Sequence, residues 1–316
     1  MKILVTGSSG FIGFHLCKYL LKKNFNVIGI DSHNKYYSDI LKKKRLSMLK
    51  KKKNFIFFKF NLINEKKLNI LFKKLNPDLV FHLAGQPGVL YSFKNPKSYL
   101  INNEKATRSI CKISKKYKIK KFILGSSSSV YGDQKKFPIL EKAKPIPKNT
   151  YAKTKLRSEI IVHNTFFKSN TNYIIFRFFT VYGPFGRPDM FIHKFLNHLK
   201  FKKLIKIYNN GLNFRDFTFI DDVVKILGKS INMKITNSII NICRSKPILT
   251  RNLIQIILKN YPVKKILLKE TKPAKGEMYK THGSNNKLKK IFGKIKFTDV
   301  EKGLKKTIKN YIKTSM

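Results

Sequence analysis

Residues 2–13 read KILVTGSSGFIG, an apolar run that leads into three evenly spaced glycines. The apolar run predicts a buried strand, and the apolar spacing after it predicts a helix that extends to about residue 23. Glycines at such a junction allow a tight turn and a close approach of the backbone to a phosphate group. The helix N-terminus adds free N–H groups and the positive end of the dipole. The stretch therefore predicts a phosphate-binding turn built on Gly7, Gly10 and Gly13.

The second expected strand, residues 26–30, ends directly before Asp31. Asp31 lies 18 residues after Gly13, where the carboxylate of a dinucleotide-binding unit binds the ribose hydroxyls. Ser32 and His33 follow Asp31, and the lack of an arginine there favours NAD over NADP. The two features together predict an NAD site.

The same alternation of short apolar strands and longer helical patterns continues to about residue 180. Such a rhythm is typical of a parallel sheet covered on both faces. We expect strands at 2–6, 26–30, 55–58, 79–84, 121–126 and 173–179, with helices at 11–23, 37–51, 65–75, 96–117 and from 151. The predicted fold is α/β, a Rossmann-type doubly wound parallel sheet with a smaller C-terminal α/β substrate lobe. We expect the NAD-binding domain at 1–180, with later segments near 212–245 returning to it, and the lobe mainly at 181–316.

The chain carries 68 basic and 16 acidic residues, a net charge of +52. Only eight of the basic residues are arginine, and the lysines are spread along nearly every exposed helical face. A protein that reads phosphates would favour clustered arginine, so we attribute the charge to drift in an AT-rich genome and expect no nucleic-acid partner. A nucleic-acid-binding protein on a Rossmann scaffold remains a distant alternative.

The cysteines indicate a reducing compartment. Cys17, Cys111 and Cys243 are far apart and have no metal-binding spacing, so we expect buried reduced thiols and no metal. The sequence begins directly on a strand without a signal-peptide pattern, and it has no apolar run of about 18 residues that would span a membrane. We expect a cytoplasmic enzyme without a membrane partner.

The sequence YAKTK places Tyr151 and Lys155 one helical turn apart, on the same helix face. A neutral phenol is a poor base near neutral pH, but a lysine ammonium beside it favours the phenolate. Tyr151 is therefore a candidate general base for a hydroxyl proton, while hydride passes to NAD. The pattern alone is common by chance, but here it follows the glycine turn and the fifth strand.

These motifs resemble the extended short-chain dehydrogenase/reductase family, and within it the nucleotide-sugar 4-epimerases, above all the UDP-glucuronate 4-epimerases. The resemblance rests on TGSSGFIGFHLC, HLAGQPGV, SSSSVYG, YAKTK, RFFTVYGPFGRPDM and YNNGLNFRDFTFIDD. It spans nearly the whole chain, and RFFTVYGPFGRPDM is highly specific. It implies an NAD-dependent isomerase that acts on a UDP-sugar, in polysaccharide biosynthesis, and a homodimer built through helices near 96–117 and 151–168.

The resemblance also implies roles for individual residues. The catalytic set is Tyr151, Lys155 and Ser127, whose hydroxyl would contact the C4 oxygen. The cofactor set is Gly7, Gly10, Phe11, Ile12, Gly13, Asp31, Asn61, Leu62, Ala84, Gly85, Tyr151, Lys155 and Phe178. The substrate set is Ser127, Ser128, Ser129, Thr180, Arg187, Arg215 and Glu277, in which Arg215 would hold the diphosphate. The alternative for Arg215 is a structural ion pair with Asp216 or Asp221.

Several positions depart from the patterns of the family or of its relatives. Asn61 and Glu277 each stand where the family usually has Asp. Leu90 replaces a usual arginine, which keeps UDP-glucose and UDP-N-acetylhexosamine as alternative substrates. Relatives that dehydrate or decarboxylate their sugar carry a carboxylate directly before VYG, where this chain has Ser129. Because serine is neither an acid nor a base near neutral pH, we expect the chemistry to stop at oxidation and re-reduction of C4.

Overall fold

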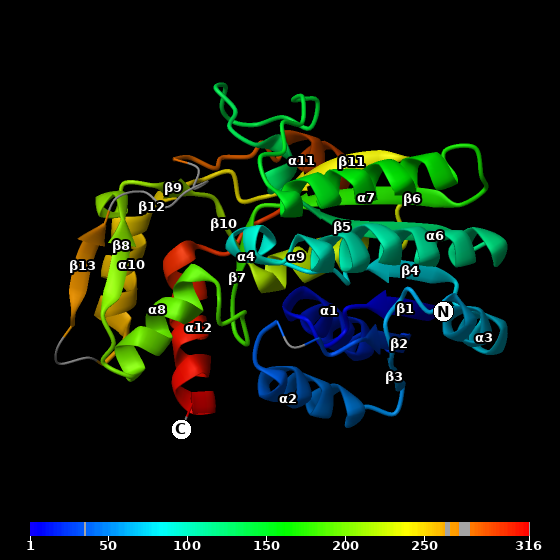
Figure 1. Ribbon diagram of the computed structural model, residues 1–316, viewed down its shortest axis with the longest axis horizontal. Coiled ribbons are helices and arrows are strands. Elements are labelled where there is room, and N and C mark those ends of the chain that lie inside the picture. The colour runs from blue at the N-terminus through cyan, green and yellow to red at the C-terminus, as the bar shows by residue number, and fades with distance from the viewer. Residues whose placement is uncertain (35, 263–265, 272–278, 316) are drawn as a thin grey trace. The chain divides into compact units, whose positions relative to one another are not determined.

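The computed structural model describes residues 1–34, 36–262, 266–271 and 279–315 (Figure 1). The chain divides into two compact units. The first unit comprises 1–132, 144–178 and 224–240, and the second comprises 133–143, 179–223 and 241–316.

The first unit is built on a seven-stranded sheet with the order β11-β6-β5-β4-β1-β2-β3. Every pair from β6 to β3 is parallel, which confirms the predicted doubly wound fold. The strands are β1 (Lys2–Thr6), β2 (Asn26–Asp31), β3 (Phe55–Lys59), β4 (Leu79–His82), β5 (Lys121–Ser127), β6 (Asn172–Phe178) and β11 (Ser238–Ile242). The central strands are apolar and buried along almost their whole length, as expected for a sheet covered on both faces.

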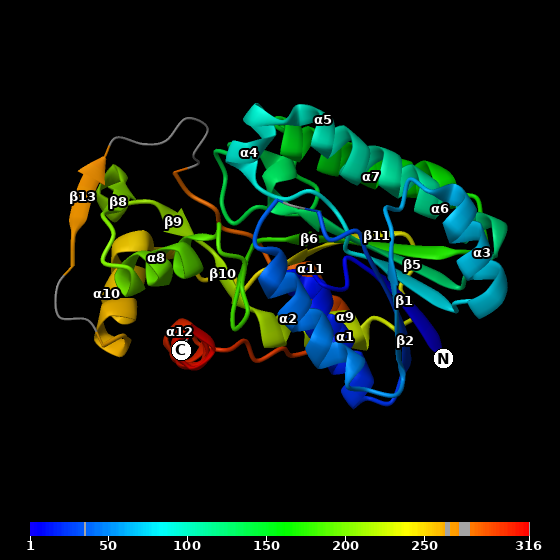
Figure 2. The same ribbon diagram turned by 60° about the horizontal axis from the view of Figure 1, so that its bottom comes forward.

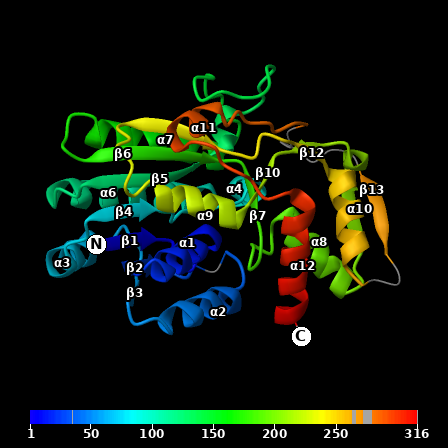
Figure 3. The same ribbon diagram turned by 180° about the vertical axis from the view of Figure 1, so that it is seen from behind.

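Helices cover both faces of this sheet, as Figure 2 shows. One face carries α3 (Glu65–Leu75), α6 (Ala106–Lys116) and α7 (Thr150–Phe166), and the other carries α1 (Phe11–Lys22), α2 (Asp39–Lys50) and α9 (Ile220–Lys229). Figure 3 shows α9 beside α1, where a Cβ on Gly228 would come within 2.2 Å of the Tyr19 ring. The short helices α4 (Val89–Lys94) and α5 (Pro96–Tyr99) lead into α6.

The continuous helix predicted over 96–117 is partly wrong. The structure interrupts it with a π-helical turn, η1 (Leu100–Lys105), between α5 and α6. The turn places Asn103 against the loop after β4, where its Oδ1 accepts a hydrogen bond from the Gln86 amide at 2.6 Å. A π turn inside a helix often marks a functional position. Here it fixes the Asn103 side chain next to the loop after β4, which carries Ala84 and Gly85.

The second unit is built from shorter elements. Its strands form three two-stranded sheets, β10-β7, β12-β9 and β13-β8. They are β7 (Thr180–Tyr182), β8 (Ile205–Tyr208), β9 (Phe214–Arg215), β10 (Phe217–Phe219), β12 (Ile248–Leu249) and β13 (Leu268–Thr271). The helices are α8 (Phe191–Lys200), α10 (Thr250–Asn260), α11 (Asn286–Phe292) and α12 (Val300–Ser315); the 3₁₀ turns are η2 (Ser128–Tyr131), in the first unit, and η3 (Asn209–Gly211).

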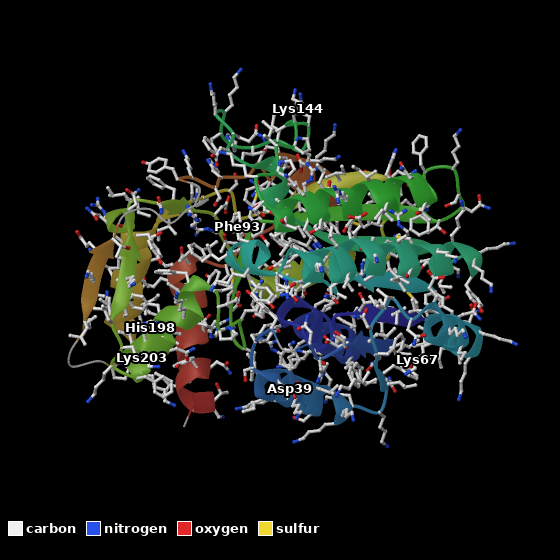
Figure 4. The ribbon with its side chains drawn as sticks, viewed as in Figure 1. Asp39, Lys67, Phe93, Lys144, His198 and Lys203 are labelled. Atoms are coloured by element: carbon white, nitrogen blue, oxygen red, sulfur yellow. The ribbon has the colours of Figure 1, made fainter. Side chains whose placement is uncertain are left out.

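Lysine side chains project into solvent from both units. Figure 4 labels Lys67 on α3 in the first unit and Lys203 in the second, and both are exposed. In the described part of the chain, no helix is long and apolar enough to cross a bilayer.

Candidate active site

The glycine turn joins β1 to α1 and brings its own backbone groups into close contact. The Gly10 amide donates to the Gly7 carbonyl at 2.9 Å, and a Cβ on Gly13 would lie 2.1 Å from that carbonyl oxygen. Gly10 is the N-cap of α1, so no side chain caps the helix, and its first turn has no acidic residue. The N-terminal amides of α1 therefore suit an anion.

Asp31 ends β2 beside the glycine turn. One carboxylate oxygen accepts a hydrogen bond from the Ser9 amide at 3.1 Å, and the other accepts from the His33 amide at 2.9 Å. Each oxygen can accept a second bond, so ribose hydroxyls can still donate to this carboxylate. The turn, the uncapped helix and Asp31 together fit NAD.

The remaining predicted cofactor residues lie along the carboxyl ends of β3, β4 and β6. Asn61 directs its amide nitrogen to Asn102 at 3.2 Å, while its oxygen accepts from the Ile63 amide at 3.1 Å. The Leu62 side chain lies in the core, so only its backbone can face a ligand. The Ala84 amide donates to the Thr6 hydroxyl at 3.1 Å, and Phe178 is buried at the end of β6.

Gly85 is more constrained than the sequence indicates. A Cβ there would lie 2.9 Å from Asn103 Oδ1. That oxygen is held by the Gln86 amide, and Asn103 Nδ2 donates to the Thr154 hydroxyl at 3.0 Å. Asn103 thus links the loop that carries Ala84 and Gly85 to α7, and sequence reasoning did not find it because both contacts are remote along the chain.

Tyr151 and Lys155 lie in the first two turns of α7, which Asn149 caps through a hydrogen bond from the Ala152 amide. The Lys155 side chain is buried, and its ammonium donates to the Gly125 carbonyl of β5 at 2.5 Å. Burial lowers the pKa of Lys155 to about 8, and the Glu159 carboxylate opposes that shift. The Tyr151 ring packs edge-on against Tyr99, with 6.1 Å between centroids.

The serine tract follows β5 directly. Ser127 ends the strand, and its hydroxyl accepts a hydrogen bond from the Ser129 amide at 3.2 Å, which caps η2. The Ser129 hydroxyl oxygen is buried and has no hydrogen-bond partner. A buried hydroxyl in that condition is costly to the free protein.

The predicted substrate residues of the second unit have protein contacts of their own. Arg187 forms a bidentate pair with Asp189, at 3.0 and 2.5 Å. Arg215 donates to the carbonyls of Phe214 at 2.9 Å and Tyr279 at 3.2 Å. The Asp216 carboxylate, which with Asp221 is an alternative partner predicted for Arg215, accepts hydrogen bonds from the Ser245 and Gly283 amides.

Two further predictions concern Thr180 and Glu277. Thr180 begins β7, where its amide donates to the Asp216 carbonyl at 3.1 Å. Glu277 lies outside the described residues.

The three cysteines are buried free thiols, and among the described residues no group of three or more His, Cys, Asp or Glu side chains could hold a metal ion.

Residues 3–243 match the NAD dependent epimerase/dehydratase family. The chain belongs to this family. A UDP-glucuronate 4-epimerase of Thermodesulfobacterium geofontis is 35% identical over 307 residues, which cover 96% of this chain and 94% of that protein. These similarities confirm the resemblance to nucleotide-sugar epimerases and the prediction of an NAD-dependent enzyme.

Solved structures give the same picture. The UDP-glucuronic acid 4-epimerase of Bacillus cereus, in complex with UDP-glucuronic acid and NAD, has a TM-score of 0.93 and 32% identity, with 99% of this chain and 100% of that chain covered. The UDP-glucose 4-epimerase of Thermotoga maritima, with UDP-glucose, has a TM-score of 0.90 and 27% identity, with both chains fully covered (100%). The family has thus adapted one backbone to sugars that differ at C6.

Proposed function

We propose that this protein interconverts UDP-glucuronate and UDP-galacturonate by NAD-dependent 4-epimerisation. The observation that carries the proposal is the end of β5. There the Lys155 ammonium, one helical turn from Tyr151, meets the Gly125 carbonyl, and the strand continues into serines with no carboxylate. This set of groups can move a proton at C4 but has no acid or base for a second reaction at C5 or C6.

NAD, when bound, supplies the acceptor and donor of the C4 hydride. The phenolate of Tyr151 takes the proton of the 4-hydroxyl, and the Ser127 hydroxyl donates a hydrogen bond to the C4 oxygen. The buried ammonium of Lys155 stabilises the phenolate. The 4-keto sugar then turns over within the site so that its opposite face can be reduced, and Tyr151 returns the proton.

The other substrate groups are proposed from the family pattern. Arg215 holds the diphosphate, for which a forked cation is suited, and Arg187 contacts the sugar or the diphosphate. The hydroxyls of Ser128, Ser129 and Thr180 donate to the C6 carboxylate. Held in that way, the carboxylate of the 4-keto intermediate is kept from leaving as CO₂. Glu277 is proposed for the uridine ribose.

The test is product analysis with purified protein and UDP-glucuronate. We expect UDP-galacturonate, no CO₂ and no net NADH, with a loss of about 10²- to 10⁴-fold in Tyr151→Phe. Release of CO₂ would refute the proposal. Faster turnover of UDP-glucose or UDP-N-acetylglucosamine would assign the alternative substrate that Leu90, 62% exposed on α4, leaves open. Salt-sensitive RNA binding without turnover would favour the nucleic-acid alternative.

We also propose a cytoplasmic homodimer formed through η1 and α7. These elements pack together and leave Leu100, Ile101 and Ile160 exposed, Ile160 to 49%. An apolar surface of this kind on adjacent helices suits a helix-pair interface. Light scattering should give twice the chain mass, and Ile160→Glu should reduce it to one chain. Ile70→Glu, a control on α3 where Ile70 is 64% exposed, should leave the dimer intact.

A further inference from the structure

A buried ion pair lies directly behind the serine tract. Glu159 of α7 and Arg177 of β6 are each 3% exposed. Arg177 Nε donates to Glu159 Oε1 at 3.0 Å and Nη2 donates to Oε2 at 2.6 Å, and the guanidinium stacks over the Tyr131 ring at 4.7 Å. Replacing a buried ion pair with apolar side chains is often neutral or stabilising, so stability alone does not account for it.

The Glu159 carboxylate accepts a third hydrogen bond, and its donor belongs to β5. The Ser126 hydroxyl donates to Glu159 Oε1 at 2.5 Å. Ser126 stands between Gly125, whose carbonyl accepts from Lys155, and Ser127, whose hydroxyl is proposed to contact C4. Because Ser126 directly precedes Ser127, this hydrogen bond also fixes the backbone from which the Ser127 side chain extends. The Glu159 carboxylate therefore fixes the end of β5, which supplies both the carbonyl bonded to Lys155 and the hydroxyl of Ser127.

The charge of Glu159 acts on Lys155 as well, because the two lie one helical turn apart. The Lys155 ammonium donates to the Gly125 carbonyl of β5 and interacts electrostatically with Glu159 on α7 and His82 on β4. Tyr151 lies one helical turn before it, and Asn103 Oδ1 and Lys155 Nζ both lie within 4 Å of the position of a Cβ on Gly85. Burial, with a smaller effect of Lys155, lowers the pKa of His82 to about 3, so this imidazole is neutral in any assay. Glu159 is thus the negative group that favours the ammonium.

We propose that Glu159 is a positioning residue of the reaction, which fixes the end of β5 through Ser126 and supports the ammonium form of Lys155 through its charge. The inference rests on the proposed function, because it assigns Glu159 to the same site. Glu159 has two effects in this proposal: it fixes the end of β5, and its charge stabilises the Lys155 ammonium. Different substitutions remove each effect. Ser126→Ala removes the link to the strand and keeps the charge. Glu159→Gln removes the charge, and Glu159→Asp keeps the charge but shortens the side chain.

The experiment measures kcat and KM for UDP-glucuronate from pH 6 to 10 in the NAD-loaded enzyme. We expect the alkaline limb of the kcat profile to move about one pH unit lower in Glu159→Gln, because the ammonium loses its stabilising charge. The limb should stay in place in Ser126→Ala and in Glu159→Asp, while kcat falls about 10- to 100-fold and KM changes little. Glu104→Gln is the matched control. Glu104 also pairs with an arginine of α7, Arg157, at 3.1 Å, but it is more exposed than Glu159. The Glu104→Gln enzyme should therefore have the same kcat and the same alkaline limb of the pH profile as the unmodified enzyme.

The outcomes are decisive in each case. An alkaline limb that Glu159→Gln leaves in place, or a kcat that Ser126→Ala leaves unchanged, would overturn the inference. If Glu159→Gln does not fold, Ser126→Ala retains the Glu159–Arg177 pair and decides the geometric part. Absence of turnover in the unmodified enzyme would instead refute the proposed function, so the two failures are distinguishable.

Discussion

Substituting Gly7 with alanine tests the cofactor turn against a control within the same chain. Gly7 has φ +70°, and a Cβ there would lie 2.8 Å from the Ala84 nitrogen and 2.9 Å from the Ala84 Cα. Gly293 also has a positive φ, +76°, with ψ −166°, but a Cβ there would meet nothing within 4 Å. Both substitutions put a side chain into the left-handed region, and only Gly7→Ala also crowds the backbone of the cofactor loop.

The expected magnitudes follow from that difference. A left-handed alanine costs about 1 kcal/mol at either position, partly offset by the lower entropy of the unfolded chain. Crowding against backbone atoms, which cannot rotate aside, adds about 1–3 kcal/mol at Gly7 alone. We therefore expect Gly293→Ala to lower the free energy of unfolding by about 1 kcal/mol and Gly7→Ala by about 2–4 kcal/mol.

Urea unfolding at 25 °C, with and without NAD, measures both effects. Any shift of Ala84 also moves the cofactor loop, so Gly7→Ala should weaken NAD binding by at least about tenfold, which is about 1.4 kcal/mol. Added NAD should then stabilise Gly7→Ala less than Gly293→Ala at the same concentration. Equal loss of stability in the two variants, together with equal NAD affinity, would refute the steric argument.

Three further predictions address the chemistry. Ser129→Glu introduces the carboxylate that the decarboxylating relatives carry at this position. The variant should therefore release CO₂ from UDP-glucuronate, measured by trapping the gas, and should yield at least about tenfold less UDP-galacturonate. Because the pKa of Lys155 in the fold is about 8, against 10.5 in the unfolded chain, the folded state binds fewer protons between these values. The stability of the NAD-free protein should therefore rise with pH from about 8 to 10, and Lys155→Met should lose up to about 3 kcal/mol of that rise in urea unfolding. Arg215→Leu should raise KM for UDP-glucuronate about 10- to 100-fold with a smaller change in kcat, and an unchanged KM would remove Arg215 from the diphosphate site.

The local parts of the site could be predicted because their signals are local. A glycine turn and a Tyr–Lys pair one helical turn apart depend on neighbours in sequence, and so do the bounds of a helix such as α3 (Glu65–Leu75), which the structure reproduces at residues 65–75. The π turn η1 has no such signal. It contains neither Gly nor Pro, and the contacts of Asn103 with Gln86 and Thr154 exist only in the folded chain.

Glu159 was missed for a related reason, although one signal was available. Its partners Ser126 and Arg177 lie 33 and 18 residues away in sequence, on different strands. The arginine itself stands inside the apolar run YIIFRFF, which forms the buried strand β6. A charge in such a strand must be paired, so the sequence did indicate that an acidic partner exists. Which of the 16 acidic residues it is depends on the packing of α7 against the sheet.

Ser129 connects the geometry of the strand end to the choice of reaction. Its hydroxyl oxygen is buried without a partner, a condition that costs about 1–3 kcal/mol unless a ligand relieves it. A hydroxyl can donate to a carboxylate, and such charge-assisted bonds are about twice as strong as neutral ones. A glutamate in the same place would repel the C6 carboxylate and could exchange a proton with C5. Under the proposed function, the same position would favour an acidic sugar and would provide no acid or base for reactions that consume its 4-keto form. Serine at this position, rather than Leu90 on α4, is therefore the main argument for proposing UDP-glucuronate.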